Sequence, residues 1–136
     1  MHKKVNKKPK QHSQAQCDKL LTPIVKMMHP ICLLNGTNPN CTYFTEVAHH
    51  HVHKSKSLIL RYNFDNLIPL CNHCHLMLHC NESFWASKIV LIKGTQWFEN
   101  LEREKNKIIK INYNEVYESL KEKERKESLK LLFGNG

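Results

Sequence analysis

Two neighbouring stretches decide the fold of this chain: EVAHHHVH at residues 46–53 and LRYNFDNLIPLCNHCHLMLH at residues 60–79. The first holds four histidines within five positions, and the second joins a C-x2-C pair to two further histidines. Residues 73–80 contain no helix breaker. In a helix His75 and His79 stand at i and i+4, so they share one face and can bind one cation. The pattern therefore predicts a metal site.

The cysteines predict a second, structural metal site. Cys71 and Cys74 form the C-x2-C pair, and Cys32 and Cys41 flank an upstream loop rich in Asn, Gly and Pro. Four thiolates suffice for a closed tetrahedral zinc site, and a core as small as residues 23–80 needs such a staple. Eight residues between the first two cysteines is a wide spacing, so the alternative is that Cys32 is only a buried apolar residue.

The remaining elements follow from local pattern. Residues 42–48 are rich in β-branched and aromatic side chains and predict a strand. A second short strand is expected at 66–70, and Pro69 makes it an edge or terminal strand. Helices are expected over 73–80, from Asn81 or Ser83 to Gly94, from Thr95 onward, and from Asn112 onward. The aromatic stripe of the later helices, Trp85, Trp97 and Phe98, is more typical of helical core than of base stacking.

Composition and charge point to a polyanionic partner. The formal net charge is +9; residues 1–60 carry nine Lys or Arg against two acids, and residues 61–136 carry twelve against ten. The basic N-terminal half is typical of a protein that binds nucleic acid, although a Lys-rich tail can also serve only solubility. We expect residues 1–21 to be a flexible basic tail. No apolar run approaches a membrane span, and no secretory signal precedes the core.

Cysteine usage indicates a reducing compartment. Six cysteines and ten histidines in such a chain are more typical of metal ligands than of disulfides. Cys17 and Cys80 have no evident partner and are expected to be free thiols.

The histidine and cysteine pattern resembles the HNH endonucleases, most closely short phage-encoded ones and phage recombination nucleases. The family pattern is a His pair, fourteen residues, Asn, eight residues, His, three residues and His. A pair at His50 and His51 reaches Asn66, His75 and His79, whereas a pair at His49 misses Asn66 by one residue. The triple-His tract leaves both pairs open. The resemblance covers residues 29–82 and implies a ββα-metal finger.

The resemblance assigns roles to these residues. His50, His75 and His79 bind a catalytic divalent metal, and His51 stays free as the general base. Asn66 ties the loop and orients the base. Arg61 is expected both in catalysis and in DNA binding, and Lys54 and Lys56 are expected to contact the DNA backbone. Arg61 would hold a phosphate next to the metal; as an alternative it is a surface salt-bridge partner.

The expected architecture is an α+β fold in three parts. These are the tail at 1–21, a zinc-stapled HNH core at 22–82 and a helical extension at 83–136. The expected function is hydrolysis of DNA by nicking or double-strand cutting, with Mg²⁺, Mn²⁺, Ni²⁺ or Zn²⁺ as the catalytic ion and Zn²⁺ as the structural ion. A structure-specific recombination nuclease and a non-catalytic zinc nucleic-acid-binding module are the alternatives. The resemblance implies the cytoplasm of a bacterium or phage-infected cell, and the sequence does not specify an oligomeric state.

Overall fold

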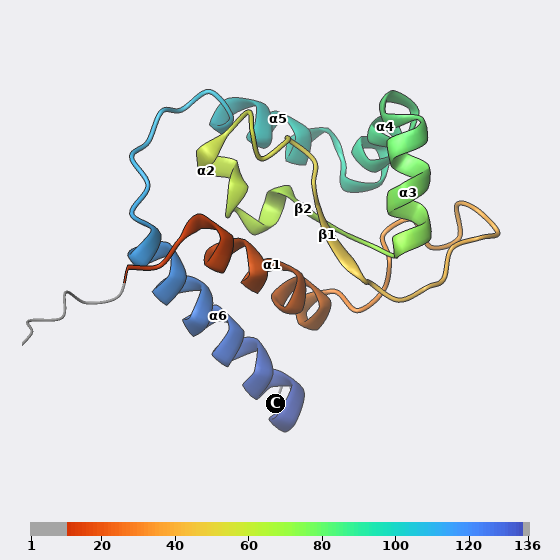
Figure 1. The fold of residues 1–136 in the computed structure, drawn as a ribbon. Helices are drawn as coiled ribbons and strands as arrows, with labels where there is room; N and C mark the ends of the chain where they lie inside the picture. The colour runs from red at the N-terminus through yellow and green to blue at the C-terminus, as the bar shows by residue number, and fades with distance from the viewer. Residues whose placement is uncertain (1–10, 135–136) are drawn as a thin grey trace, which may run out of the picture.

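A computed structural model describes residues 11–134 as a mixed α/β fold, mostly helical, with one two-stranded sheet (Figure 1). The elements run, in chain order, α1 (Gln14–Met28), β1 (Val47–His50), α2 (Leu58–Arg61), η1 (Phe64–Asn66), β2 (Leu67–Leu70), α3 (Asn72–Cys80), α4 (Glu82–Lys93), α5 (Thr95–Glu104) and α6 (Tyr113–Phe133). Within residues 11–134 no helix combines the length and apolar character needed to cross a membrane.

The two strands form an antiparallel pair that sets the orientation of every side chain near it. In its register His49 lies opposite Ile68 and His50 lies opposite Leu67. The expected second strand is confirmed, but the first is shorter and later than residues 42–48 suggested. Tyr43 has a positive φ of 76°, and that left-handed backbone ends any strand there.

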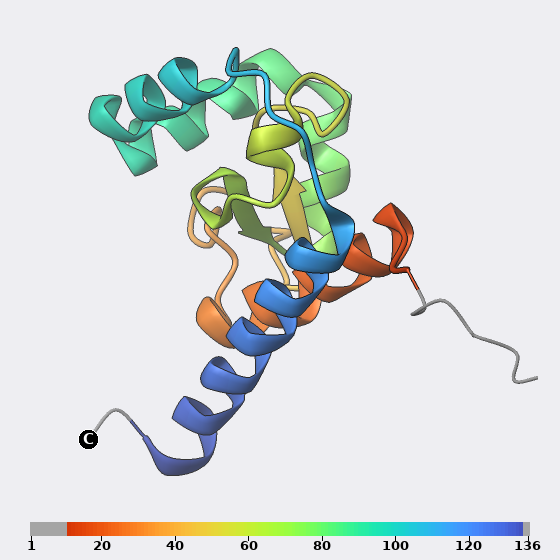
Figure 2. The ribbon, with the colours of Figure 1, turned by 90° about the vertical axis from the view of Figure 1, so that its left-hand side faces the viewer.

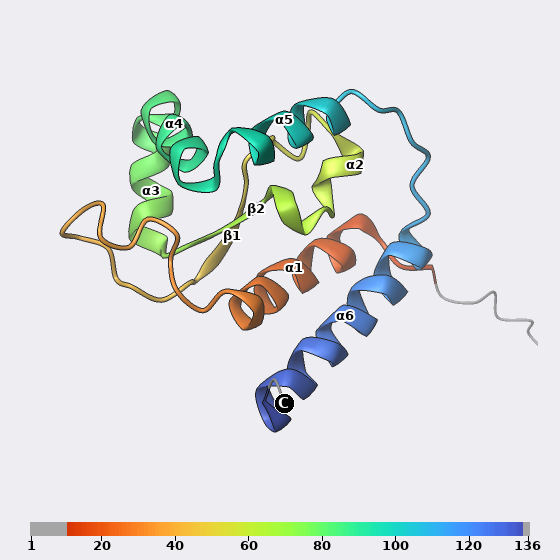
Figure 3. The same cartoon turned by 180° about the vertical axis from the view of Figure 1, so that it is seen from behind.

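The strand pair lies between helices α3 and α4 on one side and α1 and α6 on the other (Figure 3), and it separates two apolar clusters. Side chains alternate along a strand, so Ile68 and Leu70 join the cluster that includes α3 and α4, whereas Leu67 joins the one made by α1 and α6. Residues directly opposite in an antiparallel pair share a face. The side chain of His49 therefore belongs on the α3 side, and that of His50 on the α1 side.

The prediction of a flexible tail through residue 21 is wrong from Gln14 onward, where α1 begins; residues 1–10 lie outside the described part of the chain. Ser13 and Gln16 form a capping box, in which each side chain accepts a hydrogen bond from the other's backbone N–H. Cys17 and Leu21 then begin a buried stripe that continues through the helix. The capping box and the buried face stabilise a helix here despite the polar composition of the segment.

The C-terminal helices begin as predicted, and α4 ends at the predicted Gly94. Gly94 separates α4 from α5 with a φ of 99°, and the side chain of Asn112 accepts hydrogen bonds from the first backbone amides of α6. Helix α6 lies beside α1 and projects beyond it (Figure 2). Leu120 of α6 is buried in the α1 cluster, so the helical extension contributes to the core.

Candidate metal centres

The structure brings the four predicted cysteines together. Their sulfur atoms lie within 4.8 Å of one another, and those of Cys41 and Cys71 are 3.9 Å apart. Four thiolates about 2.3 Å from a tetrahedral zinc would be separated by about 3.8 Å. Cys32 is 2 % exposed, but it is one of these four possible ligands and not merely part of the core. The site is positioned to hold a metal ion.

Hydrogen bonds already point at these sulfur atoms. The backbone N–H groups of Tyr43 and Cys74 donate to the sulfurs of Cys41 and Cys71, and the Asn38 amide donates to Cys74. Tyr43, whose N–H donates to Cys41, is the residue with the left-handed backbone. Amide donors of this kind stabilise thiolate charge, which is what a metal ligand carries.

The pKa values of these cysteines shift in opposite directions. Burial raises the pKa of Cys71, but hydrogen bonds from Thr42 and from the Cys74 amide outweigh it and lower that pKa to about 6. Burial raises the pKa of Cys32 to about 11. Burial also raises the pKa of Cys74. A buried group of four sulfurs cannot carry several negative charges without a cation, so the donor set fits a divalent metal.

A second group of possible ligands consists of His49, His75 and His79, whose nearest ring nitrogens lie within 4.8 Å of one another. The Nε2 atoms of His75 and His79 are 3.0 Å apart. Imidazoles bound about 2.05 Å from a tetrahedral ion would place these nitrogens about 3.3 Å apart. Burial, and next the neighbouring His75, lower the pKa of His49 to about 3. Its ring is therefore neutral and has a lone pair for a cation.

The structure does not bring His50 together with His75 and His79, as was predicted; His49 lies beside them instead. Strand alternation decides it: His49 faces α3 and His50 faces α1. Counted from His49, the chain has one residue more before Asn66 than the family spacing has. The connecting segment at 51–65 accommodates that residue, whereas the strand cannot change which face a side chain occupies.

His50 lines the same hollow from the other face. The hollow has a volume of about 350 Å³ and opens to solvent, and His49, His75 and His79 also line it. Nε2 of His50 lies 2.9 Å from the carbonyl oxygen of Arg61. A carbonyl only accepts, so Nε2 carries the proton and Nδ1 keeps a lone pair. Burial lowers the pKa of His50, which keeps the ring neutral near pH 7.

His51, predicted to be the base, lies outside this hollow. Its ring packs against Trp97 with centroids 4.8 Å apart, and its backbone N–H donates to the carbonyl of Asn66. It lines a neighbouring hollow together with Lys56 and Lys105. His51 is therefore separated from the three converging imidazoles.

Asn66 is fully buried and holds the segment between the strands. Its Oδ1 accepts from the N–H of Val52 at 2.7 Å, and its Nδ2 donates to the carbonyls of Val52 and Leu60 at 2.9 and 3.2 Å. These contacts agree with the expected loop-tying role. Asn66 does not line the histidine hollow, and its side-chain hydrogen bonds within residues 11–134 go to Val52 and Leu60.

The predicted basic residues have different surroundings. Arg61 is 8 % exposed, and its guanidinium is bound by the carboxylate of Asp18, so it is not open to a phosphate. Lys54 lines the histidine hollow, and Lys56 lines the neighbouring one. Of the predicted cations, only Lys54 lies at the site and is exposed.

Sequence reasoning missed two side chains of the hollow. Asp18 was assigned to the tail, although the Ser13–Gln16 capping box could have revealed the helix that carries it. His53 was treated as a surface residue; it lines the hollow and contacts Glu82 at 2.5 Å. Comparison with protein-family models, with curated proteins and with solved structures finds no match to this chain.

Proposed function

We propose that the protein is a metal-dependent endonuclease of the HNH kind that hydrolyses the phosphodiester bonds of DNA. In this proposal β1, β2 and α3 form the ββα-metal finger. One observation carries it: three imidazoles, from His49, His75 and His79, converge in a hollow that His50, whose Nε2 is bound to a carbonyl oxygen, also lines. Three protein ligands leave coordination positions for a phosphate oxygen or water.

In this proposal His49 is a metal ligand and His50 is the general base. His49, His75 and His79 would hold the ion, which when bound supplies positive charge to the scissile phosphate and to the leaving oxygen. His50 accepts a proton at Nδ1 from the attacking water, while its Nε2–H remains bound to the carbonyl of Arg61. Because imidazole ligands suit Zn²⁺ and Ni²⁺ better than Mg²⁺, we expect activity to favour the former ions.

The surroundings of the hollow favour a polyanionic substrate. The chain carries a net charge of +9, and Lys54 contributes an exposed cation to the hollow itself. The carboxylate of Asp18, which also lines it, is neutralised by its pairing with Arg61. An open site with an exposed cation suits a phosphodiester backbone.

We further propose that Cys32, Cys41, Cys71 and Cys74 bind a structural zinc. The fit rests on sulfur separations near those of a tetrahedral thiolate site and on N–H groups directed at the sulfurs. The site joins the loop that precedes β1 to the start of α3, the helix that carries His75 and His79. The zinc would thereby fix the position of the catalytic helix relative to the strands.

Cleavage of plasmid DNA tests the proposal. Zinc-loaded, full-length protein is incubated with supercoiled plasmid and with a branched duplex, in separate reactions with Mg²⁺, Mn²⁺, Ni²⁺ and Zn²⁺. Wild type should nick or linearise the plasmid, and His50→Ala should be slower by about 10²–10⁴-fold because the base is lost. His29→Ala is the matched control, since this exposed histidine lies outside the hollow.

The outcomes separate the competing functions. Faster cutting of the branched duplex than of the plasmid would favour a recombination nuclease. DNA retention in a gel-shift assay without cleavage by any of the four ions would contradict the proposal and favour a non-catalytic binding module.

A further inference from the structure

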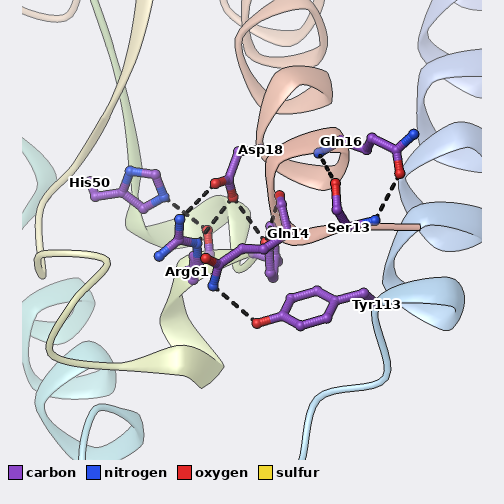
Figure 4. Close-up of polar contacts among 8 residues, drawn as sticks. Ser13, Gln14, Gln16, Asp18, His50, Arg61 and Tyr113 are labelled. Atoms are coloured by element: carbon purple, nitrogen blue, oxygen red, sulfur yellow. Dashed lines mark hydrogen bonds and ion pairs between the residues drawn. The ribbon is translucent and has the colours of Figure 1, made fainter. Parts of the chain in front are cut away.

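The ring of His50 is oriented by one peptide unit. Its Nε2–H donates to the carbonyl oxygen of Arg61, and that carbonyl belongs to the peptide linking Arg61 to Tyr62 (Figure 4). The bond selects the tautomer in which Nδ1 is unprotonated, and it restricts rotation of the ring. Whatever fixes this peptide therefore fixes the nitrogen that the proposed reaction uses.

Both residues of that peptide bind the same carboxylate. Arg61 donates from Nε to Oδ1 of Asp18 at 3.0 Å and from Nη2 to Oδ2 at 2.6 Å. The hydroxyl of Tyr62 donates to Oδ1 at 2.9 Å. A two-pronged guanidinium–carboxylate pair is directional as well as strong. The four-residue helix α2 ends at this peptide, and a helix that short is not rigid by itself.

Asp18 comes from a helix that is well anchored elsewhere. Immediately before it, Cys17 is fully buried, and three residues later Leu21 is 3 % exposed. Cys17 and Leu21 share their apolar cluster with Leu120, and this packing joins α1 to α6. Asp18 is the only acidic residue of α1, and its carboxylate lines the histidine hollow. An unpaired carboxylate there would repel DNA, so its pairing with Arg61 matters to the site.

We propose that Asp18 is a positioning residue of the nuclease: it holds the Arg61–Tyr62 peptide so that the Arg61 carbonyl fixes the tautomer and orientation of His50. This inference rests on the proposed function. It extends the site beyond the two strands and α3, because helix α1 becomes part of the machinery that orients the base.

The first test compares turnover in Asp18→Asn and Gln14→Ala proteins. Asp18→Asn keeps the side-chain shape but turns an amide toward the guanidinium, whereas Gln14→Ala removes a different contact of the same helix. Asp18→Asn should lower kcat at least about tenfold and leave KM for DNA unchanged. The upper limit of this loss is the loss of about 10²–10⁴-fold expected when the base itself is removed. Tyr62→Phe, which removes the Tyr62 hydrogen bond to Asp18 but leaves the Arg61 pair, should lower kcat to a smaller extent. Gln14→Ala should keep wild-type kcat.

The second test has a readout other than activity. Long-range ¹H–¹⁵N correlation spectra of the zinc-loaded protein should show the Nε2–H tautomer of His50 in wild type and in Gln14→Ala. Asp18→Asn should show a mixture of tautomers. Combining Asp18→Asn with His50→Ala should cost nothing beyond His50→Ala alone, since the base on which Asp18 acts is already absent.

Three results would overturn the positioning role: wild-type kcat in Asp18→Asn, an unchanged His50 tautomer, or an equal additional loss in the His50→Ala background. Failure of the nuclease proposal is distinguishable from these. In that case wild-type protein does not cut DNA, yet the spectra still decide whether Asp18 orients His50.

Discussion

Replacing Asn66 by alanine should unfold the segment that joins the strands before it affects any chemistry directly. The side chain is fully buried and makes three hydrogen bonds, two to Val52 and one to the carbonyl of Leu60. At about 1 kcal/mol each, their loss should reduce the free energy of unfolding by about 3 kcal/mol. With an unfolding entropy of about 2.1 cal/mol/K for each of the 136 residues, Tm should fall by about 10 °C.

Urea denaturation of the zinc-loaded protein, followed by circular dichroism, measures this change. Asn63→Ala is the matched control: three residues earlier, it loses one exposed side-chain hydrogen bond to the N–H of Asp65, worth about 1 kcal/mol. If Asn66→Ala were no less stable than Asn63→Ala, the loop-tying role would be refuted. If it were as stable as wild type but inactive, Asn66 would instead act in the chemistry.

Three further changes test other parts of the structure. Cys71→Ser should abolish binding of the structural zinc and unfold the core, because such sites contribute on the order of 10 kcal/mol; normal helicity with one bound zinc would contradict this. Asp18→Asn should be less stable than wild type near neutral pH. Burial raises the pKa of Asp18, but pairing with Arg61 outweighs burial and lowers it. The ion pair therefore stabilises the fold above the unfolded pKa of about 3.9, and this stabilisation is lost as pH falls through the folded pKa. An equal stability loss in an Arg61→Gln background would exclude that ion pair as its cause. Deleting residues 1–10 should flatten the slope of log affinity for DNA against log salt, and an equal slope would exclude a role in DNA binding for the lysines of that segment.

The sequence predicted the parts of the site that depend on local spacing. The i, i+4 pair at 75 and 79 requires only that α3 form, and it assembles as expected. The helix boundaries at Gly94 and Asn112 follow from single residues with strong conformational preferences. These features need no knowledge of the tertiary structure. The four cysteines lie in two distant segments, and the preference of thiolates for a shared metal ion, not local spacing, predicted that they come together.

What the sequence could not specify depended on the pairing of the strands. Three consecutive histidines offer three possible ligands, and only the register of β1 against β2 shows that His49 faces α3. The family spacing suggested His50 as the ligand, because a count of residues does not distinguish residues of the loop from residues of the strand. The contact between Asp18 and Arg61 links positions 43 residues apart, so no local pattern could indicate it.

The most direct test of the central claim is an alanine scan of His49, His50 and His51, with calorimetric metal titration and plasmid nicking on each variant. We expect His49→Ala to lose the second metal equivalent, with activity partly restored by excess metal. His50→Ala should bind that metal normally but cut about 10²–10⁴-fold more slowly, and His51→Ala should keep metal binding and much of its rate. The account is contradicted if His49→Ala binds metal as wild type does, or if His51→Ala is slowed as much as is expected of His50→Ala.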